Sequence, residues 1–310
     1  MELEDLPSVP MTCRSASAQG FTPQRFRRAV RRGLLRPVLR GVHLRADVCV
    51  TTSVKLGAAA LVINPSSVAC DRTAAWIWGV DVHEFRELDG LPPLETYVLR
   101  GHRASEREGV RGGRRDLLSA DWVEVDGVKV TTPLRTALDL GCLLRRRHAL
   151  AAMDALMRAH GFTPEDLSRA LGRYRRRRGV VQLRELVPIV DPRAESQPES
   201  WTRIELIDHG LPAPELQWWV SVDGVPTYRL DLAYPHAKVA IEYDGEEFHD
   251  APEDRERDAR RRDWLERHGW RVIVVDRTDL SRDSDRFWVG EVARLLAEAR
   301  RPPRRQYAGR

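Results

Sequence analysis

Three carboxylates lie close together in the last third of the chain, in two stretches with the alternation of β-strands. In RLDLAYP, Asp231 interrupts an apolar strand whose Leu230 and Leu232 point the other way. In KVAIEYDG, the same alternation puts Glu242 and Asp244 on one face. That face would also carry Lys238 and Ala240, and the opposite, core face would carry Val239, Ile241 and Tyr243. Strands so close in sequence commonly pair, so we expect Asp231 to lie beside Glu242 and Asp244.

Three carboxylates on one sheet face repel one another, and a partly desolvated cleft strengthens that repulsion. A divalent cation between them is the simplest remedy, and hard oxygen ligands suit Mg²⁺, or Mn²⁺ in experiments. Such an ion stabilises charge on a phosphorus centre and lowers the pKa of a bound water. The pattern therefore predicts a metal site at Asp231, Glu242 and Asp244 that hydrolyses phosphodiesters.

Other charged residues near this cluster have two readings each. Glu199 could face the site, but Ser196-x-x-Glu199 also fits a capping box at a helix start. Arg257 and Arg261, one helical turn apart, could face a scissile phosphate. The same helix could instead carry solvated salt bridges, such as Arg257 with Asp254 and Asp258 with Arg262, and for any single arginine the salt bridge is the favoured reading.

The elements that would position these residues follow one another in the order α-β-β-β-α-β-α. A helix over Ser196 to Gly210 precedes a hairpin of WWVSVDG and YRLDLAYP, and KVAIEYDG forms a third strand. EDRERDARRRDWLERHG reads as a charged helix, WRVIVVD as a fourth strand, and a last helix lies near Val289 to Ala299. This order predicts a mixed central sheet with helices on both faces.

At these residues the chain resembles the PD-(D/E)XK nuclease superfamily, in particular the branch similar to the very-short-patch repair endonuclease. The resemblance spans about Glu195 to Ala299 and rests on ESQPESWTR, YRLDLAYP, VAIEYDGEEFH and RERDARRRDWLERHGWRVIVV. It implies a restriction-endonuclease-like fold, with Glu199 as the helix acid, Asp231 as the central metal ligand and Glu242 as the first acid of the third motif.

One position departs from the superfamily pattern. Asp244 stands where a lysine usually orients or activates water. His249, in EYDGEEFH, resembles the general base of the repair-endonuclease relatives, and an imidazole with a pKa near neutrality can take a proton from water. The alternative for His249 is a histidine that closes the strand end by hydrogen bonding.

The N-terminal region is the most basic part of the chain. Eight arginines and no acid lie between Gly20 and Ala46. Thr22 and Pro23 suit a helix start, Gly33 suits its end, and LLRPVLRGVHL reads as a small hairpin. A basic helix followed by a basic hairpin predicts a winged helix that contacts phosphates. Its predicted contacts are Arg27, Arg28, Arg31 and Arg32 on the helix and Arg36 and Arg40 on the wing. The alternative is an arginine-rich surface helix and hairpin that bind no ligand. The arginines would then reflect the codon usage of a GC-rich genome, and 48 of the 51 basic residues are Arg.

GFTPQRFRRAVRRGLLRPVLRGVHLR is similar to the winged-helix segment of AbiEi-type antitoxins of type IV toxin–antitoxin systems. From Val48 to about Leu186, helices and strands alternate in a manner that resembles the middle of the same proteins. LGAAALVI and SSVACDRTAAWIWGV are expected as buried helices, and TYVLRG and WVEVDGVKVTT as strands. TPLRTALDLG and HALAAMDALMRAHGFTPEDL are expected as helices with Leu138, Cys142, Met153 and Met157 in the core.

Composition indicates the class of protein, its location and the state of its cysteines. The net charge is 51 − 46 = +5, and 42% of the 310 residues are apolar, which is usual for a soluble chain of two or three domains. The longest stretch without polar side chains, Leu56 to Ile63, is too short for a membrane span, and the acidic N-terminus is unlike a secretory leader, so we expect a cytoplasmic protein. The four cysteines are expected to be reduced and buried.

DPRAESQP reads as a domain boundary. The expected α/β (α+β) chain is a basic winged helix over 1–47, an antitoxin-like α+β region over 48–190, a PD-(D/E)XK-like domain over 191–300 and a basic flexible tail over 301–310. The leading hypothesis is a Mg²⁺- or Mn²⁺-dependent endonuclease delivered to DNA by the winged helix. The alternative is a non-catalytic, antitoxin-like regulator with a degenerate nuclease domain. A toxin or regulatory protein is a further expected partner.

Overall fold

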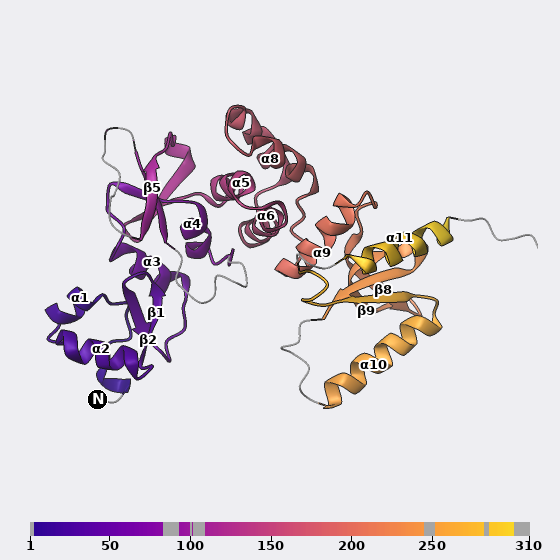
Figure 1. Ribbon diagram of the computed structural model, residues 1–310, viewed down its shortest axis with the longest axis horizontal. Coiled ribbons are helices and arrows are strands. Elements are labelled where there is room, and N and C mark those ends of the chain that lie inside the picture. Colours follow the sequence, from indigo (N-terminus) through magenta and orange to yellow (C-terminus); the bar gives the residue numbers. More distant parts are fainter. Residues whose placement is uncertain are drawn as a thin grey trace, which may run out of the picture. The chain divides into compact units, whose positions relative to one another are not determined.

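A computed structural model describes residues 3–82, 93–99, 101, 109–244, 252–281 and 285–300, with the backbone alone at 252–255. The chain divides into two compact units, Met1–Val190 and Asp191–Arg310. Each unit has its own sheets and helices (Figure 1). Among the described helices, none is long and apolar enough to cross a membrane.

The first unit begins with the predicted basic helix and hairpin. After α1 (Cys13–Ala18), α2 (Pro23–Arg31) starts where the Thr22 side chain accepts a hydrogen bond from the Arg25 N–H and Pro23 occupies the first turn. Strands β1 (Leu35–Leu39) and β2 (Val42–Arg45) pair antiparallel through a turn at Gly41, which has the positive φ that such a turn needs. Phe26 and Leu35 are buried between helix and hairpin.

A five-stranded sheet forms the centre of the first unit, in the order β5-β4-β3-β7-β6. Its strands are β3 (Ser67–Ala69), β4 (Leu94–Val98), β5 (Val110–Arg114), β6 (Trp122–Val125) and β7 (Val128–Thr131). The prediction of a helix over all of SSVACDRTAAWIWGV was wrong. Its first part is β3, a short apolar run held between β4 and β7, and a run this short fits a buried strand as well as a helix.

The first unit also contains the helices α3 (Thr52–Ala60), α4 (Asp71–Ile77), α5 (Pro133–Leu143), α6 (Arg146–His160), α7 (Pro164–Ala170) and α8 (Val180–Leu186). Of these, α3 and α4 contact the five-stranded sheet, α5 packs on α4, and the next three helices pack on α5. Leu138, Met153 and Met157 are buried as predicted. All four cysteines are free, but only Cys70 is buried, so the prediction of buried thiols was wrong for exposed Cys49. Cys49 lies in the irregular stretch before α3, where no element covers it.

The second unit has the predicted order of elements. It runs through α9 (Gln197–Asp208), β8 (Glu215–Val222), β9 (Val225–Tyr234), β10 (Val239–Tyr243), α10 (Pro252–Arg267), β11 (Arg271–Val275) and α11 (Phe287–Ala299). The sheet order is β11-β10-β9-β8, with β10 parallel to β11 and the other pairs antiparallel. Helix α10 lies on one side of this sheet and α9 and α11 on the other (Figure 1). The predicted fold class, a mixed sheet with helices on both faces, is confirmed.

Both faces of β10 are covered, and this changes one expectation. Ala240, placed by alternation on the acidic face, is fully buried against Leu265 of α10 and Trp270. Lys238 precedes the strand in a left-handed conformation, and its ammonium donates to the His268 carbonyl over 3.0 Å. The acidic face is therefore packed along most of its length, and the carboxylates occupy only its carboxyl end.

Candidate active site

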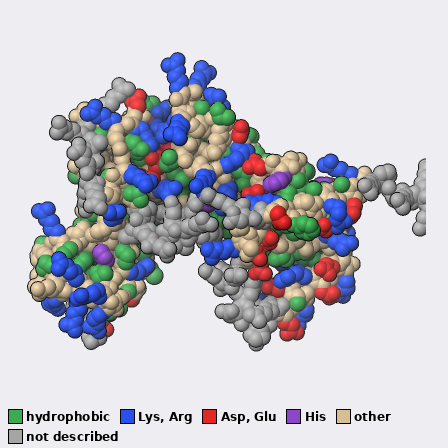
Figure 2. All heavy atoms as spheres, viewed as in Figure 1, with side chains coloured by type: hydrophobic (Ala, Val, Ile, Leu, Met, Phe, Trp, Pro, Cys, Tyr) green, Lys and Arg blue, Asp and Glu red, His purple; other side chains and the backbone are tan. Residues whose placement is uncertain are grey.

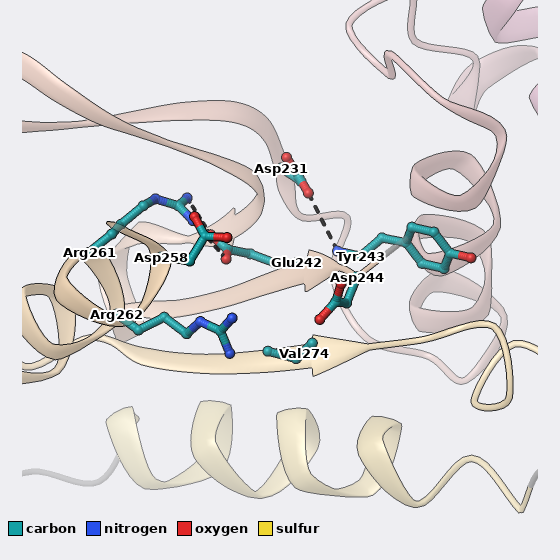
Figure 3. A pocket seen from close by; sticks show the side chains of 8 residues that line it. All are labelled: Asp231, Glu242, Tyr243, Asp244, Asp258, Arg261, Arg262 and Val274. Atoms are coloured by element: carbon teal, nitrogen blue, oxygen red, sulfur yellow. Dashed lines mark hydrogen bonds and ion pairs between the residues drawn. The ribbon is translucent and has the colours of Figure 1, made fainter. Parts of the chain in front are cut away.

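The pairing of β9 with β10 brings two of the predicted carboxylates opposite each other. Ile241 pairs with Leu232, so the next step along the ladder places Glu242 beside Asp231. The Tyr243 N–H donates to Asp231 Oδ2 over 3.4 Å, in place of a backbone acceptor (Figure 3). Asp244 follows directly, and its N–H donates to the Val275 carbonyl of β11 over 2.9 Å.

These three carboxylates line one small cavity of about 140 Å³. Its other lining residues come from β10, α10 and β11: Tyr243, Asp258, Arg261, Arg262 and Val274 (Figure 3). The sheet thus supplies three acids, and α10 supplies two arginines and a fourth acid, Asp258. Strand alternation and the order of elements brought Asp231, Glu242 and Asp244 together as the sequence predicted.

Glu242 already has a positive partner within the chain. Arg261 reaches from α10 and donates through Nη1 to Oε2 over 2.9 Å and through Nη2 to Oε1 over 2.5 Å. Nη2 also donates to the Arg229 carbonyl over 2.7 Å. The pair is largely shielded from water, with side chains 25% and 13% exposed. This bidentate geometry is the strong form of an arginine–carboxylate contact, so Arg261 is held across the site and not in a salt bridge along the helix surface.

Asp231 carries the electrostatic strain of the site. Burial, followed by the charges of Glu199 and Glu242, raises the pKa of Asp231 to about 6, against the smaller opposing effects of the Tyr243 N–H and Arg261. The four acids and two arginines that line the cavity give it a formal charge of 2 − 4 = −2. A further cation would favour the ionised form of Asp231.

Glu199 both caps α9 and contributes charge near Asp231. It is 7% exposed, and its carboxylate accepts hydrogen bonds from the Glu195 N–H, the Ser196 hydroxyl and the Gln217 amide over 2.9, 2.8 and 2.9 Å. The Glu199 N–H in turn donates to Ser196 Oγ. Ser196 therefore caps α9, but the reciprocal contact of the predicted capping box goes to the Glu195 N–H and not to the Ser196 N–H. The Glu199 charge also contributes to the raised pKa of Asp231. Glu199 is outside the set that lines the cavity.

The donor set can be tested against a hard divalent cation. Asp231 and Glu242 line the same cavity with carboxylates, the kind of ligand Mg²⁺ takes, and water and phosphate oxygens could complete the coordination there. Within the described ranges, no three His, Cys, Asp or Glu side chains are arranged as a metal site. The chemistry of the two acids fits such an ion, on the condition that Arg261 gives up part of Glu242.

Comparison with known proteins places the chain in a family. A family model described as AbiEi antitoxin C-terminal domain matches residues 67–189, and a restriction endonuclease model, REase_MTES_1575, matches residues 217–296. Over 247 residues the chain is 34% identical to Rv2248 of Mycobacterium tuberculosis strain ATCC 25618 / H37Rv, covering 79% of this chain and 87% of that protein. MT2308 of strain CDC 1551 / Oshkosh matches to the same extent. The chain belongs to the family of these mycobacterial proteins, both of which carry the name "uncharacterized protein". The resemblance of the middle region to AbiEi-type antitoxins and that of the last third to restriction endonucleases are confirmed.

Within the restriction endonuclease-like domain, two predicted residues have different outcomes. His249 lies outside the described residues. Arg257 borders a groove beside the cavity, together with Arg229, Tyr228 and Trp219 of β8 and β9. The sequence analysis missed Trp219, although two adjacent tryptophans in a strand already put one of them on an outward face.

The predicted nucleic-acid contacts of the first unit lie on its surface. Six arginines of α2 and the hairpin are exposed, namely Arg27, Arg28, Arg31, Arg32, Arg36 and Arg40. Arg36 also donates to the Val48 carbonyl over 2.7 Å. Figure 2 shows basic side chains gathered over these N-terminal elements. The helix and wing therefore present the positive surface that phosphate binding requires.

The antitoxin-like region contains a buried charge network that the sequence did not reveal. Asp139 is fully buried and accepts hydrogen bonds from Arg115, Arg135 and the Tyr174 hydroxyl, and it also pairs with Arg177 over 2.8 Å. Arg115 bridges Asp139 to Asp71, and Asp121 joins through Arg135 and Arg173. Desolvation is offset only because each carboxylate has several donors. We assign this network a structural role.

Proposed function

We propose that the restriction endonuclease-like domain hydrolyses nucleic-acid phosphodiesters with a divalent metal ion, and that the N-terminal winged helix delivers it to DNA. The observation that supports this most is Asp231 opposite Glu242 in an open cavity, with the pKa of Asp231 raised to about 6 by burial and by neighbouring carboxylates. Clustered acids that repel one another are costly unless a ligand uses them. The similarity to the very-short-patch repair branch is part of this proposal.

In this mechanism Asp231 and Glu242 would hold Mg²⁺ or Mn²⁺, with Asp244 beside them. The bound ion supplies a water of lowered pKa and neutralises phosphate charge. Arg261 then leaves Glu242 and turns its guanidinium to the phosphate, while Arg262 lines the same cavity. Arg257, on the same helix, would contact the nucleic-acid backbone. Asp244 cannot replace the usual lysine as a cation, so His249 stays the proposed general base.

The test is cleavage of plasmid DNA by the full chain with Mg²⁺ or Mn²⁺. We expect cleavage by the parent, none by Asp231→Asn or Glu242→Gln, and undiminished cleavage by Asp263→Asn. Asp263 is a suitable control because it is an exposed acid of α10 that pairs with Arg267 of the same helix and does not line the cavity. Binding to DNA should survive both site variants, since the change removes negative charge. Equal cleavage by Asp231→Asn and the parent would contradict the proposed metal site.

A second function has its own support. The bidentate Arg261–Glu242 pair neutralises the site internally, and Asp244 takes the place of the usual lysine. An antitoxin-like DNA-binding regulator with a silent nuclease domain, partnered by a toxin, would explain both features and the AbiEi match over residues 67–189. Salt-dependent DNA binding by a parent that cuts no DNA with Mg²⁺ or Mn²⁺ would favour this alternative. A cytoplasmic location stays a prediction under both functions.

A further inference from the structure

The outer strand of the second sheet exposes an aromatic surface. Among the described strands, β8 pairs with β9 alone, and its Trp219 is 51% exposed. The preceding Trp218 is 38% exposed. Tryptophan is usually well buried, so a half-exposed ring next to a candidate active site is an unusual use of apolar surface.

Trp219 borders a groove next to the carboxylate cavity. The groove holds about 580 Å³ and is lined by Trp219, Thr227, Tyr228, Arg229, Arg257, Asp258, Arg260 and Arg261. Asp258 and Arg261 line the carboxylate cavity as well, so the groove and the cavity are neighbours that share two side chains. Four arginines and one aspartate give the groove a formal charge of 4 − 1 = +3. Its volume falls in the range of about 300 to 1,000 Å³ that ligand sites commonly have.

Ring contacts and an ion pair hold the side chains that line the groove. Tyr228 packs on Trp264 of α10 with ring centroids 5.0 Å apart, and Trp264 stacks on His268 at 3.7 Å. Arg229 forms two hydrogen bonds of 2.9 Å with Glu195. This ion pair is close to half exposed on both sides, and such pairs are weak, so an incoming phosphate could replace Glu195 at modest cost.

We propose that this groove binds an unpaired nucleotide of the substrate, with its base stacked on Trp219 and its phosphate held by the arginines. An aromatic ring beside guanidinium groups matches a nucleotide in both shape and charge. A base within a duplex has both faces covered by its neighbours, so the ring can stack only on an unpaired base. The inference rests on the proposed function and deepens it: the substrate is a nucleic acid with an unpaired base next to the phosphate that is cut.

The experiment measures base stacking without catalysis. The full chain, in EDTA, is titrated into a 12-nucleotide single-stranded DNA with one 2-aminopurine, and into a blunt duplex of the same sequence. We expect the parent to quench 2-aminopurine fluorescence in the single strand. Trp219→Ala should abolish this quenching and weaken single-strand binding by about 5- to 150-fold, the effect of losing one stacked base. Binding to the duplex should change little.

Trp218→Ala is the matched control, because it removes the adjacent exposed tryptophan, which does not line the groove. Trp219→Phe, which keeps an aromatic ring, should retain part of the quenching. Thermal unfolding of each variant excludes loss of fold. Equal effects of Trp218→Ala and Trp219→Ala would overturn the inference. Equal loss of single-strand and duplex binding in Trp219→Ala would overturn it too. Unchanged binding of both DNAs would also overturn it, and would favour a protein partner for the exposed tryptophans of β8.

The groove and the nuclease activity can fail independently in these experiments. Quenching that depends on Trp219 in a chain that cleaves nothing would keep the groove and reject the nuclease. Cleavage that depends on Asp231 but not on Trp219, with no quenching, would keep the nuclease and reject the groove.

Discussion

Asp231→Asn is expected to make the second unit more stable while it abolishes cleavage. Burial and two neighbouring carboxylates raise the pKa of Asp231 from 3.8 to about 6. Each unit of pKa difference between folded and unfolded chain corresponds to about 1.4 kcal/mol, so the ionised carboxylate lowers the free energy of unfolding by about 3 kcal/mol at neutral pH. Asparagine keeps the shape and can still accept the Tyr243 N–H, so most of this energy, about 2 to 3 kcal/mol, should be regained.

The raised pKa of Asp231 also determines how the free energy of unfolding depends on pH. Because the pKa is raised in the folded chain, the folded state holds the proton more tightly than the unfolded state. The free energy of unfolding of the parent should therefore fall as the pH rises from 3.8 to about 6, and then stay level with respect to this group. The advantage of Asp231→Asn should be absent below this window and complete above it.

Urea unfolding at several pH values, followed by tryptophan fluorescence, measures the difference in free energy of unfolding between Asp231→Asn and the parent. Six of the nine tryptophans lie in the second unit, at positions 201, 218, 219, 264, 270 and 288, so the signal reports mainly on it. Asp263→Asn, an exposed change on α10, should show no pH-dependent gain. Mn²⁺ should stabilise the parent more than Asp231→Asn. An Asp231→Asn variant less stable than the parent at pH 7.5, or a difference independent of pH, would refute the reasoning.

Three further predictions concern other contacts. Arg261→Gln frees Glu242 from its bidentate partner, so Mn²⁺ affinity by calorimetry should rise about tenfold, whereas weaker binding would show that Arg261 supports the metal site. The double change Arg28→Gln and Arg32→Gln should reduce the slope of log K against log salt for DNA binding by about two, equally for all sequences, and an effect on one sequence alone would make them base readers. Asp139→Ala strands several buried donors and should lower the free energy of unfolding of the first unit by about 3 to 5 kcal/mol in thermal or urea denaturation, with a near-zero effect contradicting the network.

Local patterns in the sequence determined the order of the elements and the position of the acids. Thr22 with Pro23, and Ser196 with Glu199, start helices because a side-chain oxygen near the chain turn satisfies free N–H groups wherever the rest of the protein lies. Asp231 stood out because it is a charged residue in an otherwise apolar strand, on the face opposite to Leu230 and Leu232. Its pairing with Glu242 followed because antiparallel neighbours in sequence are usually neighbours in a sheet.

Other features depended on tertiary packing. Short apolar runs such as Ser67–Ala69 fit either a strand or a helix, and only pairing with β4 and β7 decided for the strand. Periodicity puts Arg261 on a helix surface among acids of its own helix, yet it pairs with Glu242 because α10 packs on the sheet at β11, the neighbour of β10. The groove at Trp219 and the buried partners of Asp139 likewise join segments far apart in the sequence. Which partner a charged side chain takes depends on which groups the packed elements bring within reach, and local sequence patterns do not contain that information.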